Sequence, residues 1–145
     1  MPAFHILIVD DDGSQRMLMR FLVLRSCPTA TIAEAPNGQA ALTSYETDGA
    51  DLIITDIQMP ILDGIALTAA LRARNCALPI IVVSGASDGE ALASSAGASR
   101  YLSKTVLAAQ LPQVLADVLA AGAAALTPID WKHPRPRHAR LYVII

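Results

Sequence analysis

Charged residues and long hydrophobic runs are both scarce in this sequence of 145 residues. Charged residues make up 17% and hydrophobic residues 53%, a balance that excludes a disordered chain. The 11 Lys and Arg residues are offset by 13 Asp and Glu residues, so no basic excess indicates nucleic-acid binding. No apolar run reaches the roughly 18 residues of a membrane-spanning helix. The N-terminus also lacks the basic start and long apolar stretch of a signal peptide.

Cysteine is equally scarce. Cys27 and Cys76 are the two cysteines, and their spacing fits neither a C-x-x-C motif nor another metal-ligand pattern. Isolated thiols with apolar neighbours are typical of a reducing compartment, so we expect a cytoplasmic protein without disulfides. The length suits one compact domain that needs no disulfide or structural metal to fold.

Short aliphatic runs alternate with longer amphipathic segments along the chain. The apolar runs predict strands over residues 4–9, 31–34, 51–55, 78–83 and 99–102. The segments between them predict helices over 14–25, 38–46, 65–74 and 88–96, followed by an alanine-rich helix that ends near residue 125. Ser14 and Asn37 are the expected N-caps of the first two helices. Pro112 suits the last helix if it falls in the first turn.

Nearly continuous apolar strands separated by helices predict an α/β fold. A parallel sheet has both faces covered by helices, and right-handed crossovers then produce a doubly wound arrangement. Ligands of such sheets bind beyond the carboxyl ends of the strands. That rule draws attention to the polar residues that follow the predicted strands.

Five polar residues follow four of these strands: Asp10, Asp11, Asp56, Ser84 and Lys104. Carboxylates held close together repel one another, and a cation relieves the repulsion. Oxygen ligands without cysteine or histidine favour Mg²⁺ over zinc. A metal beside Asp56 indicates phosphoryl chemistry with this carboxylate as the nucleophile. Lys104 and Ser84 would then contact phosphoryl oxygens.

Each of these residues also has an ordinary structural interpretation. An acidic run is usually a solvated turn, and an Asp after a strand is usually a helix cap or turn residue. Ser84-Gly85 alone is a common turn, and a single lysine such as Lys104 is usually a surface residue. Their shared position at strand ends is what favours a functional site.

Four segments of the sequence resemble the receiver domain of two-component response regulators. They are Ile8-Val9-Asp10-Asp11, Asp56-Ile57-Gln58-Met59-Pro60-Ile61-Leu62-Asp63-Gly64, Val82-Val83-Ser84-Gly85 and Tyr101-Leu102-Ser103-Lys104. They occur in the order of the family and at nearly its spacing. The resemblance covers roughly residues 4–125, so we expect a receiver domain over 1–126 and a C-terminal tail or linker over 127–145.

The resemblance implies a flavodoxin-like fold with five helices and the strand order 2-1-3-4-5. It also implies that Asp56 accepts a phosphoryl group from a histidine kinase or a histidine phosphotransfer protein. Asp11, Asp56 and the backbone carbonyl of Gln58 would bind Mg²⁺ directly, and Asp10 would do so through water. The chain would act as a phosphoacceptor signalling protein whose own chemistry is limited to self phosphotransfer and autodephosphorylation.

The family also implies a conformational switch. Ser84 matches the hydroxyl residue that reaches toward the phosphoryl group, and Lys104 matches the lysine that pairs with it. Tyr101 matches the aromatic residue that moves inward with Ser84; its ordinary interpretation is a half-buried edge residue with a hydrated hydroxyl.

Three features depart from the family pattern. Thr105 follows Lys104 where proline is usual, so the bond between them is expected to be trans, because a cis bond before another residue costs about 2.5–4 kcal/mol. The segment between Ser84 and Lys104 is about two residues short, which predicts a short or irregular fourth helix. Asp12 adds a further negative charge beside the predicted metal site.

Other functions fit these residues less well. A phosphatase of the haloacid dehalogenase type needs a second Asp two residues after its nucleophile, where this chain has Gln58. An FMN carrier needs a hydroxyl-rich and glycine-rich loop after the first strand and aromatic residues around the flavin. A receiver-like interaction module would not need the acidic cluster that this chain retains. A phosphorelay intermediate and the N-terminal piece of a larger regulator stay open.

The tail contains four of the 11 Lys and Arg residues and ends in five apolar residues, 141–145. Two interpretations stay open: a basic linker, or a segment whose apolar end docks on a sheet edge or on a second copy of the chain. The second would favour a homodimer. We expect neither direct nucleic-acid binding nor membrane insertion.

Overall fold

The computed structural model describes residues 4–74 and 77–126; the expectations for residues 127–145 lie outside them. The strands are β1 (His5–Val9), β2 (Thr31–Ala35), β3 (Leu52–Asp56), β4 (Ile80–Ser84) and β5 (Arg100–Ser103). The helices are α1 (Gly13–Ser26), α2 (Gly38–Asp48), α3 (Gly64–Ala73), α4 (Gly89–Ala96), the 3₁₀ turn η1 (Lys104–Val106) and α5 (Leu107–Leu126).

The strands form one sheet in the order β2-β1-β3-β4-β5, and every neighbouring pair is parallel. This order confirms the expected doubly wound fold. The central strands β3 and β4 are buried at every position, which explains why they appear in the sequence as continuous apolar runs.

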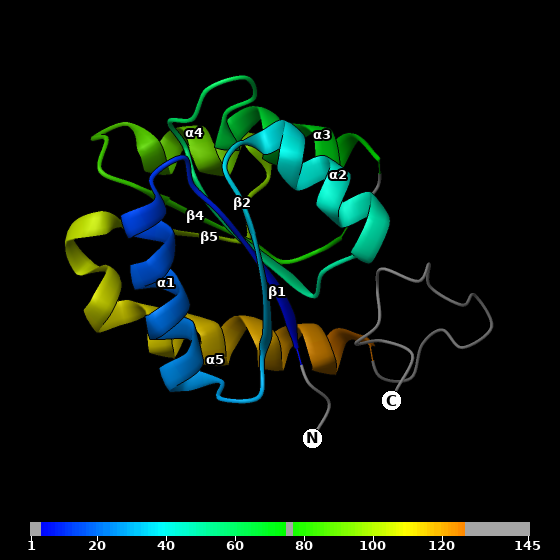
Figure 1. Cartoon of the computed structure of the whole chain (residues 1–145), viewed down its shortest axis with the longest axis vertical. Coiled ribbons are helices and arrows are strands. Elements are labelled where there is room, and N and C mark those ends of the chain that lie inside the picture. The colour runs from blue at the N-terminus through cyan, green and yellow to red at the C-terminus, as the bar shows by residue number, and fades with distance from the viewer. Residues whose placement is uncertain (1–3, 75–76, 127–145) are drawn as a thin grey trace.

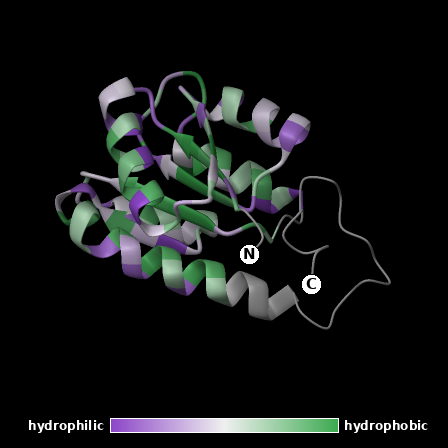
Figure 2. Cartoon of the chain, turned by 60° about the horizontal axis from the view of Figure 1, so that its bottom comes forward, coloured by the Kyte–Doolittle hydropathy of each residue, from purple (hydrophilic) through white to green (hydrophobic). Residues whose placement is uncertain are grey.

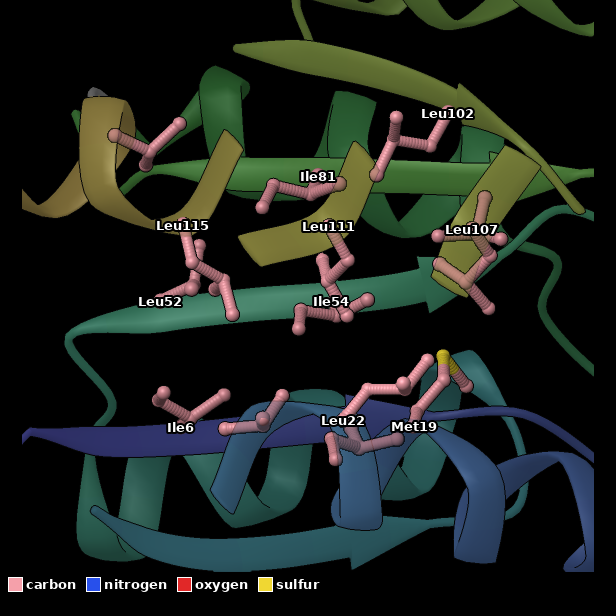
Figure 3. Packing of buried hydrophobic residues seen from close by; sticks show 14 of the residues in the cluster. Ile6, Met19, Leu22, Leu52, Ile54, Ile81, Leu102, Leu107, Leu111 and Leu115 are labelled. Atoms are coloured by element: carbon pink, nitrogen blue, oxygen red, sulfur yellow. The ribbon is translucent and has the colours of Figure 1, made fainter. Parts of the chain in front are cut away.

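Helices cover both faces of the sheet. Figure 1 shows α1 and α5 on one side and α2, α3 and α4 on the other. Successive side chains of a strand point to opposite faces, so Ile6 and Ile8 pack toward α1 and α5 while Leu7 and Val9 pack toward α2 and α3. Figure 3 shows the first of these cores, in which leucines of α5 meet the aliphatic residues of β1, β3 and β4.

The distribution of hydrophobic residues matches this arrangement of a sheet between two layers of helices. Figure 2 shows predominantly hydrophobic strands at the centre, whereas the helices around them carry both hydrophobic and hydrophilic residues. Amphipathic helices of this kind bury one face against a sheet. Within the part of the chain that the structure describes, no helix is long and apolar enough to cross a membrane.

Side-chain caps start three of the α-helices. Asp12 caps α1 by accepting hydrogen bonds from the backbone N–H groups of Ser14 and Gln15, at 2.8 and 3.4 Å. The expectation that Ser14 caps this helix is therefore wrong, because the helix begins one residue before it. The expected cap Asn37 is confirmed: its side chain accepts from the N–H of Ala40 at 2.8 Å. Asp63 caps α3 in the same way.

The last two helices differ from an ideal helix as well. α4 spans only eight residues, which confirms the expected short fourth helix. Pro112 is the sixth residue of α5. It therefore lies past the first turn, and the condition under which the sequence made it compatible with this helix is not met. At this position its missing N–H removes a hydrogen bond to the carbonyl of Ala108.

Candidate functional site

The polar residues singled out in the sequence lie together at one edge of the sheet. Asp10 and Asp11 directly follow β1, Asp56 ends β3 and Ser84 ends β4. Lys104 directly follows β5. Since these four strands are parallel neighbours, their carboxyl ends face the same side, which is where ligands of doubly wound sheets bind.

Three carboxylates form an acidic cluster at this edge. One carboxylate oxygen from each of Asp10, Asp11 and Asp56 lies within 4.8 Å of the other two. Asp11 is exposed, whereas Asp10 and Asp56 are only 1% and 5% exposed. Two buried carboxylates this close together need positive charge nearby.

Lys104 supplies part of that charge. Its Nζ lies 3.4 Å from Oδ1 of Asp56 and 3.7 Å from Oδ2 of Asp10. The ammonium is therefore shared between two carboxylates and reaches both from the end of the edge strand β5, across β4. As a compact point charge, it can pair with a carboxylate or with a phosphoryl oxygen.

Burial raises the pKa of both buried carboxyl groups. For Asp10, desolvation is the largest cause, and the nearby Asp56 charge adds to it. For Asp56, desolvation again dominates and outweighs the opposing effect of Lys104. The ammonium therefore compensates only part of the cost of burying these charges.

The carboxylate oxygens of this cluster are suitable ligands for a hard divalent cation such as Mg²⁺. Oδ2 of Asp10 is buried and has no hydrogen-bond partner among the described residues. Its neighbours in the cluster offer carboxylate oxygens, which Mg²⁺ prefers. The second oxygen of Asp10 accepts from the N–H of Asp12 at 2.9 Å, and Asp56 Oδ1 accepts from the N–H of Ile57 at 2.9 Å. These bonds hold the two carboxylates in place.

Ser84 and Tyr101 are linked through the loop between β4 and α4. Ser84 is 2% exposed, and its hydroxyl oxygen accepts from the N–H of Ala86 at 3.0 Å. The hydroxyl of Tyr101 lies 3.2 Å from the carbonyl oxygen of Ser84 and 3.3 Å from that of Ala86. The Tyr101 hydroxyl is thus bonded to the loop that begins at Ser84.

The turn that carries Lys104 is built without proline. No cis peptide bond occurs in the described ranges, so the expected trans bond before Thr105 is confirmed. The Ser103 side chain caps η1 by accepting from the N–H of Thr105 at 3.3 Å, and the two hydroxyl oxygens lie 2.9 Å apart. Lys104 reaches the acidic cluster from this capped turn.

The supporting contacts of two residues, Arg16 and Gly64, were not identified from the sequence. Arg16 donates from Nη1 to the carbonyl oxygen of Asp10 at 2.7 Å and from Nε to Glu34 at 3.0 Å. Gly64 packs so closely on β3 that a Cβ atom would lie 1.9 Å from the carbonyl oxygen of Asp56. The glycine was visible in the Asp63-Gly64 pair, whereas the partners of Arg16 depend on how β1, β2 and α1 come together.

Known proteins place this chain in a family. The family model described as the response regulator receiver domain matches residues 6–116. The chain is 38% identical to the transcriptional regulatory protein PrrA of Mycobacterium tuberculosis over 110 residues, 74% of this chain and 46% of that protein. It is 34% identical to a protein-glutamate methylesterase/protein-glutamine glutaminase of Trichodesmium erythraeum over 108 residues, 72% of this chain and 31% of that protein.

Solved structures agree. A two-component response regulator of the LuxR family from Aurantimonas sp. SI85-9A1 aligns with a TM-score of 0.75 at 30% identity, over 83% of this chain and 87% of that one. A CheY-like receiver domain protein from Methanospirillum hungatei shares the fold, with a TM-score of 0.75 at 23% identity over 86% of this chain and 99% of that one. The chain spans less than half the length of the two curated relatives above. By its sequence and its fold, the chain belongs to the family of response regulator receiver domains.

Proposed function

We propose that the chain accepts a phosphoryl group on Asp56 from a phosphohistidine of a sensor kinase or phosphotransfer protein, with Mg²⁺ bound at the acidic cluster. The observation that carries this proposal is the Lys104 ammonium, 3.4 Å from Asp56 and 3.7 Å from Asp10, at a cluster that Asp11 completes. That arrangement provides a nucleophile and a cation where a phosphoryl group would arrive. The family supports the same interpretation, because receiver domains are signalling domains.

In the transfer, an Asp56 oxygen attacks phosphorus while the phosphorus–nitrogen bond of the donor breaks. The electron pair of that bond passes to the imidazole, and Asp56 becomes an acyl phosphate. Asp10, Asp11, Asp56 and the backbone carbonyl of Gln58 would hold Mg²⁺, which supplies positive charge for the phosphoryl oxygens. Lys104 pairs with one of these oxygens, and the hydroxyl of Ser84 donates to another.

The resulting change would pass through Ser84 to Tyr101. Because the Tyr101 hydroxyl is bonded to the carbonyls of Ser84 and Ala86, a movement of this loop also moves the tyrosine. The surface formed by α4, β5 and α5 would then change its affinity for a partner or for a second copy of the chain. A cytoplasmic location follows from the same role, since kinase and receiver would share that compartment.

Intact-mass analysis after incubation with a phosphoryl donor tests this function. Acetyl phosphate with Mg²⁺ should add one phosphoryl group to the native chain and to Asp48→Asn, a matched control at the exposed end of α2. Asp56→Asn should gain none, and the group on the native chain should be lost in base, as expected of an acyl phosphate. A phosphate located on Ser84, or full labelling of Asp56→Asn, would contradict the proposal.

An exposed apolar surface on α1 supports a protein as the donor. Met17 and Phe21 are 70% and 57% exposed, and Leu18 is exposed beside them. Exposed hydrophobic groups that lie close together often mark interaction sites. The helix that carries them begins directly after the acidic turn, so a partner bound there would lie close to Asp56.

Comparing a protein donor with acetyl phosphate distinguishes this docking contact from the phosphoryl transfer itself, because only the protein donor can bind to α1. We expect Phe21→Ser to slow transfer from a phosphohistidine protein about tenfold, the effect of a contact worth roughly 1.4 kcal/mol, and to leave labelling by acetyl phosphate unchanged. Leu92→Ser, which removes an exposed leucine of α4, is the control. Equal rates for the native chain and Phe21→Ser with the protein donor would exclude this docking surface.

A further inference from the structure

Gly89, the first residue of α4, lies directly against Tyr101. A Cβ atom at this position would be 2.8 Å from the Tyr101 hydroxyl oxygen and 3.0 Å from Cε2 of its ring. The same Cβ would lie 3.2 Å from the Cβ of Ser84. A side chain at position 89 therefore cannot coexist with Tyr101 in its present place.

The backbone conformation at position 89 does not require a glycine. Gly89 lies outside the left-handed region, in contrast to Gly49 and Gly97. Within a helix, glycine is less favourable than alanine because it loses more conformational freedom on folding. α4 is also weakly started, since Asp88 makes no side-chain cap hydrogen bond. A glycine at this point of a short helix needs another reason, and the Tyr101 ring provides one.

Tyr101 is held from the other side by the loop. Its hydroxyl lies between the carbonyl oxygens of Ser84 and Ala86, and the N–H of Gly89 donates to Ala86 at 3.3 Å. Tyr101 is the register partner of Val82 in β4, which places its side chain beside the end of that strand. The ring thus contacts both the loop that begins at Ser84 and the first turn of α4.

We propose that Gly89 is a positioning residue for Tyr101. By leaving room at the start of α4, it keeps the phenol hydroxyl on the loop that begins at Ser84. A larger residue would displace the ring and release the loop from it. The use of this contact in signalling rests on the proposed function, whereas the placement of the ring does not.

A double-mutant cycle in the full chain tests the contact. The change in thermal midpoint caused by Gly89→Ala should be more favourable in the Tyr101→Ala background than in the native background. Without the tyrosine ring, the helix gains an alanine and displaces nothing. Gly85→Ala is the control, since a Cβ at Gly85 meets nothing within 4 Å; its effect should be the same in both backgrounds. Equal effects of Gly89→Ala in the two backgrounds would overturn the proposal. A Gly89→Ala chain that folds only together with Tyr101→Ala would support it.

A spectroscopic readout reports the ring itself. In a chain labelled with 3-fluorotyrosine, the ¹⁹F resonance of Tyr101 is the one that disappears in Tyr101→Phe. Gly89→Ala should shift this resonance further than Gly85→Ala does, and an unshifted resonance would contradict the proposal. Neither measurement uses Mg²⁺ or a phosphoryl donor, so this inference and the phosphorylation of Asp56 can fail independently.

Discussion

At the scale of single residues, the site depends on a glycine as much as on its charged groups. Gly64 donates its N–H to the carbonyl of Ile57 at 2.9 Å. The place where a Cβ would stand on Gly64 is already filled by the carbonyl of Asp56. The contact lets α3 begin immediately beside the end of β3. The position of the Asp56 backbone is thereby set by a residue that carries no side chain.

We therefore expect Gly64→Ala to damage both stability and phosphorylation. The added Cβ would lie 1.9 Å from a backbone oxygen, which cannot move aside as a flexible side chain would. Overpacking of this kind typically costs about 1–3 kcal/mol, measurable as a lower urea midpoint. Labelling of Asp56 by acetyl phosphate should slow as its backbone shifts. Gly85→Ala is the matched control, and equal midpoints for the two variants would contradict the prediction.

The positions of the site residues were predictable from the sequence where they depend on strand ends, and contacts were missed where they depend on packing. Asp10, Asp56 and Lys104 could be found because each follows a recognisable apolar run. The cap of α1 was misplaced because Asp12 and Ser14 are both good cap residues, and only the backbone of the turn decides between them. The contact of Gly89 with Tyr101 joins two elements, so no local pattern indicates it.

At the scale of elements, the strands were the easiest to predict and the turns the hardest. β3 and β4 are buried at every position, so their sequences are continuously aliphatic. The edge strand β2 has exposed or half-buried residues at four of its five positions, which explains its weaker signal. The 3₁₀ turn at Lys104 was not predicted, because it depends on the hydroxyl contacts of Ser103 and Thr105.

The proline in α5 leads to a prediction about this element. Pro112 is exposed in the helix interior, so replacing it loses little packing. Pro112→Ala should restore the hydrogen bond to Ala108 and raise the free energy of unfolding by up to about 3 kcal/mol. Urea denaturation of the full chain measures this change. The neighbouring substitution Gln113→Ala, also at an exposed position, should have a far smaller effect, and an unchanged or lower midpoint for Pro112→Ala would contradict the argument.

At the scale of the whole molecule, the acidic cluster couples the stability of the fold to protons. Folding raises the pKa of Asp10 and Asp56, chiefly through desolvation. The folded chain therefore holds these two protons more tightly than the unfolded chain does. Their contribution favours folding at low pH and is lost as the pH rises from the ordinary carboxyl range through the raised pKa values. Ionising both groups in the fold carries a desolvation cost that a bound cation would offset.

We accordingly expect Mg²⁺ to stabilise the full chain at neutral pH. At a free concentration ten times its dissociation constant, a ligand that binds only the folded state contributes about 1.4 kcal/mol. The gain should fade as the solution is acidified, because protons then compete for the carboxylates that hold the ion. Asp11→Asn should abolish the response by removing the exposed ligand of the cluster, while Asp48→Asn keeps it. Thermal unfolding with and without Mg²⁺, from neutral pH down to the ordinary carboxyl range, measures the gain and its loss in acid. The same measurement is made on the native chain and on both variants. If Mg²⁺ stabilises Asp11→Asn as much as it stabilises the native chain, the ion does not bind at the acidic cluster.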